Sequence, residues 1–204
     1  MPKSQSKKHY EWVILPQEYF SLALVGLKFL KKLLPNEPFK SGLKDKFNFS
    51  HPVSYLITPI IYNFKHGIEL YLKGIGNIWD QDYEHSHDLI FLLNTLINKL
   101  NKESELSFVS NVLETKLRPV IDKYYFGLYI PSNNSKNMPD LRNESERYTE
   151  SKGYSIQKIW HRSLGANRFF IVDIKLVKSI EKDIRVVHNI LRQEVYSKVC
   201  NLKN

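Results

Sequence analysis

The sequence holds a single cysteine, Cys200, and no apolar run long enough to cross a membrane. One cysteine excludes an intramolecular disulfide and any zinc site built from several cysteines. A transmembrane helix needs about 18 apolar residues in a row, and the best candidate, residues 20–27, is followed at once by Lys28. We therefore expect a cytoplasmic protein without a membrane partner.

Motifs that mark common catalytic and nucleotide-binding sites are also missing. The chain has no Gly-x-Ser-x-Gly nucleophile motif, no Walker A loop and no Gly-x-Gly-x-x-Gly fingerprint. His85 and His87 could bind a metal together with Glu84 or Asp88, but the spacing is loose and a capping turn explains it better. We expect no cofactor and no resident metal.

Positive charge is what the sequence has in excess, with a net charge of +9 over 204 residues. Residues 1–50 carry nine Lys and Arg against four acids, residues 51–150 ten against thirteen, and residues 151–204 eleven against four. If the two basic ends meet in the fold, they form one positive face that favours a polyanion. The alternative is that dispersed lysines only solvate helix faces.

Apolar residues recur at three- and four-residue steps in five segments, which is the period of amphipathic helices. We predict an all-α fold with helices over 18–34, 54–76, 86–101, 105–125 and 173–199. Pro59 offers a second starting point for the second helix, Ser86 is the expected cap of the third, and Pro119 should kink or split the fourth.

The length suits one domain, which we place at residues 18–200 after a flexible segment over 1–17. Residues 127–168 lack helical periodicity and are expected to form a long irregular connection before the last helix. A turn at Lys152-Gly153, between RYTES and YSIQKIW, fits a short β-hairpin within that connection.

A polar stripe is expected on the second helix, opposite its apolar stripe. Its members are Tyr62, His66, Glu69 and Lys73, of which Glu69 and Lys73 have the i,i+4 spacing of a helical ion pair. Further along, Arg147 lies before a turn, where it could bind an anion or stack on a ring. The alternative is that Arg147 makes a salt bridge to the acidic loop around residue 84.

Arg185 and His188 share one face of the last helix at i,i+3 spacing. A guanidinium beside an imidazole could serve phosphodiester cleavage, with Arg stabilising phosphate charge and His moving the proton. The alternative is a core histidine, since His188 borders the apolar stripe of Ile184 and Leu191.

Three motifs follow one another in a fixed order: Glu69-Leu-Tyr-Leu-Lys73 late in a helix, His85-Ser-His-Asp-Leu89 opening the next, and Arg147-Tyr148 with Gly153 before the last helix. Over about residues 54–200 this order resembles the HEPN superfamily (higher eukaryotes and prokaryotes nucleotide-binding domain), and within it an uncharacterised bacterial branch. The resemblance implies an antiparallel helical bundle, often a homodimer.

Many HEPN proteins are metal-independent ribonucleases whose signature is Arg, four to six residues, then His. That signature is missing here, because only two residues separate Arg185 from His188. The resemblance therefore implies a non-catalytic module that binds a nucleotide, RNA or a protein partner, in a phage-defence or toxin–antitoxin setting. The expected ligand-binding residues are Tyr62, His66, Glu69, Lys73, His85, His87, Asp88, Arg147 and Tyr148.

Four of those residues, Lys73, His87, Asp88 and Arg147, are expected to converge on one pocket. A different hypothesis is a divergent metal-independent ribonuclease, a toxin or antiphage effector, that uses Arg185 and His188. A third is a purely structural module whose basic ends only keep it soluble. The sequence favours the non-catalytic alternatives without deciding the question of catalysis.

Overall fold

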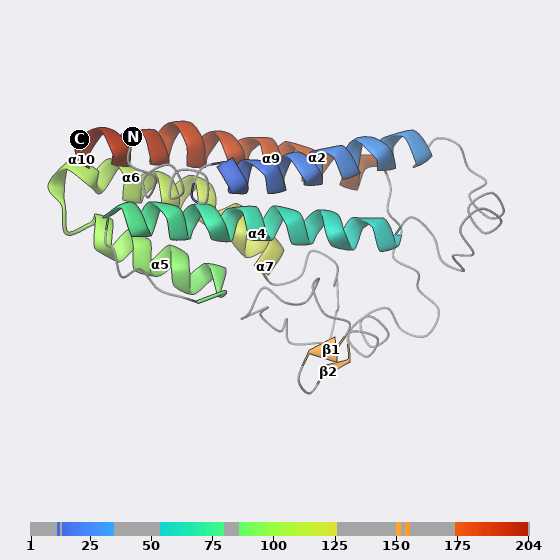
Figure 1. Ribbon diagram of the computed structural model, residues 1–204, viewed down its shortest axis with the longest axis horizontal. Coiled ribbons are helices and arrows are strands. Elements are labelled where there is room, and N and C mark those ends of the chain that lie inside the picture. Colours follow the sequence, from blue (N-terminus) through green and yellow to red (C-terminus); the bar gives the residue numbers. More distant parts are fainter. Residues whose placement is uncertain are drawn as a thin grey trace, which may run out of the picture.

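The computed structural model describes residues 12, 14–34, 54–79, 86–125, 150–151, 154–155 and 174–203. These residues are almost entirely helical, which confirms the all-α prediction. The helices lie side by side around a shared apolar core (Figure 1). Buried side chains of this core come from both ends of the described chain, from Phe20 to Val199.

Helix α2 (Leu15–Leu33) packs against α4 (Ser54–Trp79) in the opposite direction. Early in α2 the ring of Tyr19 meets that of His66, whereas later in α2 Gly26 lies against Ile60. Close approach is possible because α4 also offers a glycine to α2. A Cβ at Gly67 would lie 2.8 Å from Cε1 of Phe20.

Helix α4 begins where the predicted range 54–76 begins and ends later than predicted. It begins at Ser54, so Pro59 lies inside the helix and does not start it. It continues through Gly74 and Gly76 to Trp79, three residues beyond the predicted end. Gly74 instead admits the chain around Trp12, whose Cβ would lie 2.7 Å from a Cβ at residue 74.

Helix α5 (Leu89–Leu100) starts three residues later than expected. Its cap is Asp88, whose carboxylate accepts hydrogen bonds from the backbone N–H groups of Ile90 and Phe91 at 2.9 and 3.0 Å. Ser86, the expected cap, instead accepts a hydrogen bond from the backbone N–H of Asp88. Both residue types cap helices well, so the sequence alone could not choose between them.

The predicted fourth helix is divided into η3 (Ser104–Leu106), α6 (Ser107–Val112), η4 (Leu113–Leu117) and α7 (Arg118–Tyr125). The predicted distortion at Pro119 takes the form of the π-helical turn η4, in which the N–H of Arg118 bonds to the carbonyl of Leu113. A proline cannot donate its own hydrogen bond, and a π turn beside it absorbs the disruption.

The last helical segment runs antiparallel to both α2 and α7. It consists of α9 (Ile174–Asn189), the π-helical stretch η5 (Ile190–Tyr196) and α10 (Ser197–Lys203). Lys31 of α2 pairs with Glu181 while the earlier Phe20 packs against the later His188. On the other side, Lys123 of α7 bonds Asp183 at 2.5 Å.

The predicted irregular connection over 127–168 lies outside the described residues except for four positions. There β1 (Glu150–Ser151) and β2 (Tyr154–Ser155) pair antiparallel, with Glu150 opposite Ser155. Two residues per strand are too short a ladder to establish a hairpin, so the hairpin stays a prediction.

Candidate functional site

A buried carboxylate on α4 gathers three cationic or titratable side chains. Glu69 is 2% exposed, and its Oε1 accepts hydrogen bonds from Nζ of Lys73 at 2.8 Å and Nδ1 of His87 at 2.9 Å. Its Oε2 lies 3.4 Å from Nδ1 of His66. The polar stripe predicted on α4 is thus buried at Glu69, where His87, just before α5, contacts it.

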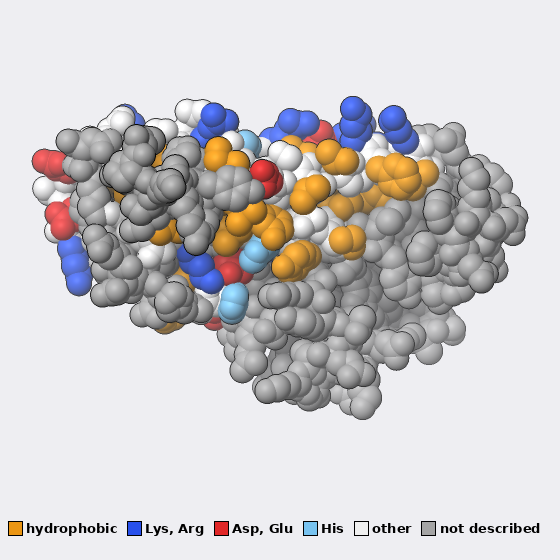
Figure 2. Space-filling view, viewed as in Figure 1, with side chains coloured by type: hydrophobic (Ala, Val, Ile, Leu, Met, Phe, Trp, Pro, Cys, Tyr) orange, Lys and Arg blue, Asp and Glu red, His pale blue; other side chains and the backbone are white. Residues whose placement is uncertain are grey.

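Aromatic rings hold His66 in place within this Glu69 cluster, which consists of His66, Glu69, Lys73 and His87. The ring of Tyr62 stacks on His66 at 5.5 Å and 11°, and Tyr19 of α2 meets it edge-on at 4.5 Å. Histidine, acidic and basic side chains are seen together on this face of the molecule (Figure 2). His66 is thus fixed by three helical neighbours before any ligand binds.

The N-terminal cap of α5 positions His87 beside Glu69. Because Asp88 holds the first turn of α5, the residue before it is fixed in direction. The side chain of His87 is 50% exposed, so its ring joins a buried carboxylate to solvent. A carboxylate that orients one ring nitrogen of a half-exposed imidazole is suited to hydrogen bonding or proton transfer at the other nitrogen.

The charges within the Glu69 cluster offset one another. A buried carboxylate is costly unless it is paired and hydrogen-bonded, and Lys73 and His87 meet that need. The cluster therefore fastens α4 to the start of α5. In the described ranges, no group of three His, Cys, Asp or Glu side chains is arranged to hold a metal ion.

The predicted convergence of four residues is met only in part. Lys73 and His87 meet at Glu69, whereas the carboxylate of Asp88 is used in capping α5. His85, Arg147 and Tyr148 lie outside the described residues. In the part described, Lys73 and His87 belong to a compact ion-paired cluster around Glu69, and their convergence with Arg147 stays a prediction.

A second candidate site is an open groove between α2 and α9. It encloses about 260 Å³ and is lined by Leu24, Arg185, His188, Asn189, Arg192 and Gln193. Arg185, His188 and Arg192 are spaced i, i+3 and i+7, so they follow one face of the helix. We call this the Arg–His groove.

His188 has one edge in the Arg–His groove and the other in the core. Its Nε2 is buried without a hydrogen-bond partner, and its ring lies 5.5 Å from that of Phe20 and 6.5 Å from that of Tyr71. Burial, and secondarily the charge of Arg192, lowers the pKa of His188 below its usual 6.5. A neutral imidazole in this position can accept a proton.

The hydroxyl of Tyr71, on α4, is a second buried polar atom without a hydrogen-bond partner. Burial raises the pKa of Tyr71 to about 12, although nearby Gln17 and Arg192 oppose the rise. Unpaired polar atoms are costly in a core and are often bridged by water. Tyr71 does not line the Arg–His groove, but its ring lies behind His188 in the core.

Arg185 is anchored by an acid on its own helix. Its Nε and Nη2 donate to Oε1 of Glu181 at 3.3 and 2.9 Å, and its side chain remains 64% exposed. Hydrogen bonds from Lys31 and then Arg185 lower the pKa of Glu181. This places two cations around one acid at the junction of α2 and α9.

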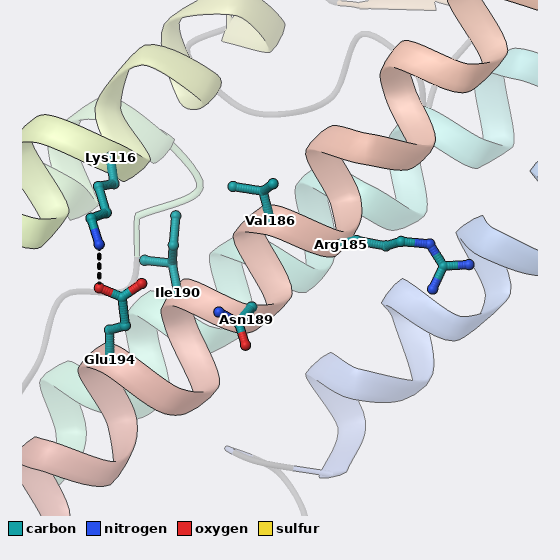
Figure 3. Close-up of a pocket in the computed structure, with 6 residues that line it drawn as sticks. All are labelled: Lys116, Arg185, Val186, Asn189, Ile190 and Glu194. Carbon is teal, nitrogen blue, oxygen red and sulfur yellow. Dashed lines mark hydrogen bonds and ion pairs between the residues drawn. The ribbon is translucent and has the colours of Figure 1, made fainter.

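A second hollow lies on the other side of Arg185, between η4 and the segment formed by α9 and η5. It encloses about 420 Å³ and is lined by Lys116, Arg185, Val186, Asn189, Ile190 and Glu194. Figure 3 shows Arg185 extending away from this hollow, whereas Lys116 bonds Glu194 at 2.6 Å. Lys116 and Glu194 are paired with each other, and Arg185 points away from this hollow. We therefore take the Arg–His groove as the better candidate site.

The outward face of α9 and η5 carries a row of exposed cations. The members are spaced by three, four, three and seven residues, and Asn189 fills the long gap: Lys175, Lys178, Lys182, Arg185 and Arg192. Figure 2 shows Lys and Arg side chains along this edge, over α2 and α9. We call this row the α9 basic stripe.

The two basic ends of the sequence do meet in the described structure, as one of the alternatives predicted. Lys28 and Lys32 of α2 are exposed, and α2 packs directly on α9. The sequence interpretation considered Arg185, His188 and Arg192 for a basic cleft, but it did not single out Lys178 or Lys182 as site residues. Their helical spacing was visible in the sequence and would have identified them.

Comparison with known proteins adds no relative. No family model, curated protein or solved structure matches the chain. Within the described residues, no helix is both long enough and apolar enough to cross a membrane.

Proposed function

We propose that this chain is a non-catalytic, HEPN-like helical module that binds nucleic acid, with RNA the first candidate, along the α9 basic stripe. The observation that carries the proposal is that Lys178, Lys182 and Arg192 are exposed on one helix face, and that Arg192 also lines a groove. Cations at this spacing neutralise successive phosphates without reading bases.

The Arg–His groove gives the stripe a local binding point. Among the described residues, Arg192 has no ion-pair partner, and it lies one helical turn from His188. A phosphate placed there would meet a guanidinium, which binds phosphate oxygens in a two-pronged geometry. Arg185 flanks the same point, held in place by Glu181.

The Glu69 cluster supports this function from a distance. The cluster holds α4 in place, and α2 packs closely against α4. The charged groups of the cluster are already paired with one another. We assign it a positioning role, with His87 as its one half-exposed group. The resemblance to HEPN proteins supports a cytoplasmic phage-defence or toxin–antitoxin setting as part of the proposal.

The test is binding of a fluorescently labelled single-stranded RNA, followed by anisotropy. The triple variant Lys178→Gln/Lys182→Gln/Arg192→Gln leaves the Arg185–Glu181 pair intact and should bind at least about tenfold more weakly, since each lost phosphate contact reduces affinity. Lys102→Gln removes an exposed cation from the opposite part of the chain and serves as the control. Equal affinity for all three proteins would refute the proposal.

A second candidate function is a divergent metal-independent ribonuclease. Arg185 and His188 line one groove, and the lowered pKa of His188 keeps its imidazole available as a base. Against it, Nε2 of His188 is buried and Arg185 is committed to Glu181. Incubation with RNA and EDTA, beside Arg185→Ala/His188→Ala, separates the two: cleavage by the unmodified chain alone would establish the enzyme.

A further inference from the structure

The outer face of α2 exposes large apolar side chains. Leu22 is 57% exposed, Val25 65% and Phe29 51%, whereas Phe20 and Leu27 on the inner face are fully buried. Figure 2 shows hydrophobic side chains at the surface over α2. A contiguous exposed apolar row on a helix commonly marks an interaction surface.

The spacing of this row is that of a coiled-coil seam. Glu18, Leu22, Val25, Phe29 and Lys32 alternate four- and three-residue steps, and all five are exposed. Such a seam suits packing against a second helix, knobs into holes. The charged residues stand at its two ends, and the apolar residues lie between them.

The seam is complementary to itself. In an antiparallel pairing of two α2 helices centred on Val25, Glu18 of one copy lies opposite Lys32 of the other, and the same contact recurs at the other end. Each contact lies about 10 Å from the centre along the helix axis. We propose that this face of α2 is the contact between two copies of this chain.

Charge favours a second copy in this register. A parallel pairing would place Glu18 beside Glu18 and Lys32 beside Lys32, whereas the antiparallel pairing matches opposite charges. Both side chains also make contacts within their own chain, and exposed ion pairs exchange partners at little cost. The orientation is therefore set by the sign of the charges at the ends.

The pairing would also arrange the α9 basic stripe. A twofold axis that reverses α2 keeps each flank on its own side, so both α9 helices would lie on one face of the dimer. They would be separated by at least two helix spacings, about 20 Å, which exceeds the Debye length of about 8 Å at physiological salt. Resting on the proposed function, this would give the nucleic-acid surface a second basic stripe on the same face.

Three side chains on one helix form a small contact. Stable interfaces bury about 800 Å² per partner, so the dimer should dissociate on dilution. Sedimentation equilibrium of the full chain over a wide concentration range should therefore show a reversible monomer–dimer equilibrium. A chain that remains monomeric at every concentration would overturn the proposal.

Val25→Glu should abolish dimerisation, because it places two carboxylates opposite each other at the centre. The matched control is Phe108→Glu on α6, where the exposed fraction of the side chain is also 57%. Thermal unfolding of both variants checks that each is folded. A dimer lost equally in both variants, or in neither, contradicts the assignment to α2.

A charge exchange tests the register. Glu18→Lys and Lys32→Glu should each weaken the dimer, and the double variant should restore it, since the pairing is inverted at both ends. Failure of the double variant to restore association would refute the antiparallel contact. A different protein or an anionic surface as the true occupant would also fail this rescue.

RNA binding separates this proposal from the proposed function. Val25→Glu should remain competent to bind RNA through a single α9 basic stripe. A monomeric wild type that binds RNA would overturn only the dimer, and a dimer that does not bind RNA would overturn only the nucleic-acid function.

Discussion

Nδ1 of His87 lies 2.9 Å from Oε1 of Glu69, across 18 positions of sequence. The contact joins the first exposed turn before α5 to the interior of α4. Because Lys73 donates to the same oxygen at 2.8 Å, the buried carboxylate has hydrogen-bond partners from two elements. The start of α5 is thereby held in position by a charge that the apolar pattern of α4 does not reveal.

Glu69→Gln should lower the free energy of unfolding by about 1–3 kcal/mol, because it leaves Lys73 and His87 without their anion in a covered site. Urea unfolding monitored by circular dichroism measures the change. Glu103→Gln, at an exposed position between α5 and η3, should shift the midpoint little. Equal midpoints for wild type and Glu69→Gln would show that the cluster does not contribute to stability.

His188 should make stability depend on pH. Its pKa in the folded chain is below the usual 6.5, so the unfolded chain binds more protons as the pH falls. Stability contributed by the neutral form is present above pH 6.5 and is lost as the pH falls toward the lowered pKa. Urea midpoints between about pH 7 and pH 5 should fall more for wild type than for His188→Phe.

The substituted ring in His188→Phe would still pack on Phe20 and Tyr71, so the comparison isolates the titration. Identical pH slopes for the two proteins would mean that protonation of His188 costs the fold nothing.

Gly67→Ala should destabilise the chain by about 1–3 kcal/mol through overpacking. Alanine is the better helix former by about 1 kcal/mol, but its Cβ would lie 2.8 Å from Phe20 and 3.2 Å from the carbonyl oxygen of Pro16. The backbone carbonyl cannot move away as a flexible side chain can. A rise in the melting temperature would show that α2 and α4 are less closely packed than described.

Lys31→Gln should lower stability by less than about 1 kcal/mol at neutral pH, since the pair with Glu181 is partly exposed. Hydrogen bonds from Lys31 and Arg185 lower the pKa of Glu181 from 4.5, so the pair contributes above that pH. The difference between the two proteins should shrink as the pH falls through the lowered pKa. Persistence of the difference in strong acid would exclude this ion pair as its source.

The helices and most of the core could be predicted from the sequence. The buried stripe of α4, with Ile61, Phe64, Ile68, Leu72 and Ile75, follows the helical period, and all five side chains are buried. A local pattern suffices there because the core side of each amphipathic helix is set by its own residues.

Tertiary contacts explain what the sequence could not predict. Glu69 lies beside the apolar stripe of α4, and only the arrival of α5 covers it. The stretch η5 has the apolar spacing of an ordinary helix, so nothing in its pattern indicated π-helical backbone. The Arg–His groove depends on Leu24 of α2 lying against α9, a pairing of segments far apart in the chain.

The salt dependence of RNA binding tests the central claim most directly. The logarithm of the association constant for a single-stranded RNA should fall linearly with the logarithm of salt concentration, by about 0.7 for each phosphate neutralised. The variant Lys178→Gln/Lys182→Gln/Arg192→Gln should show a slope shallower by about 2, because three contacts are removed. An unchanged slope would mean that the α9 basic stripe does not contact the phosphates, and would contradict the account.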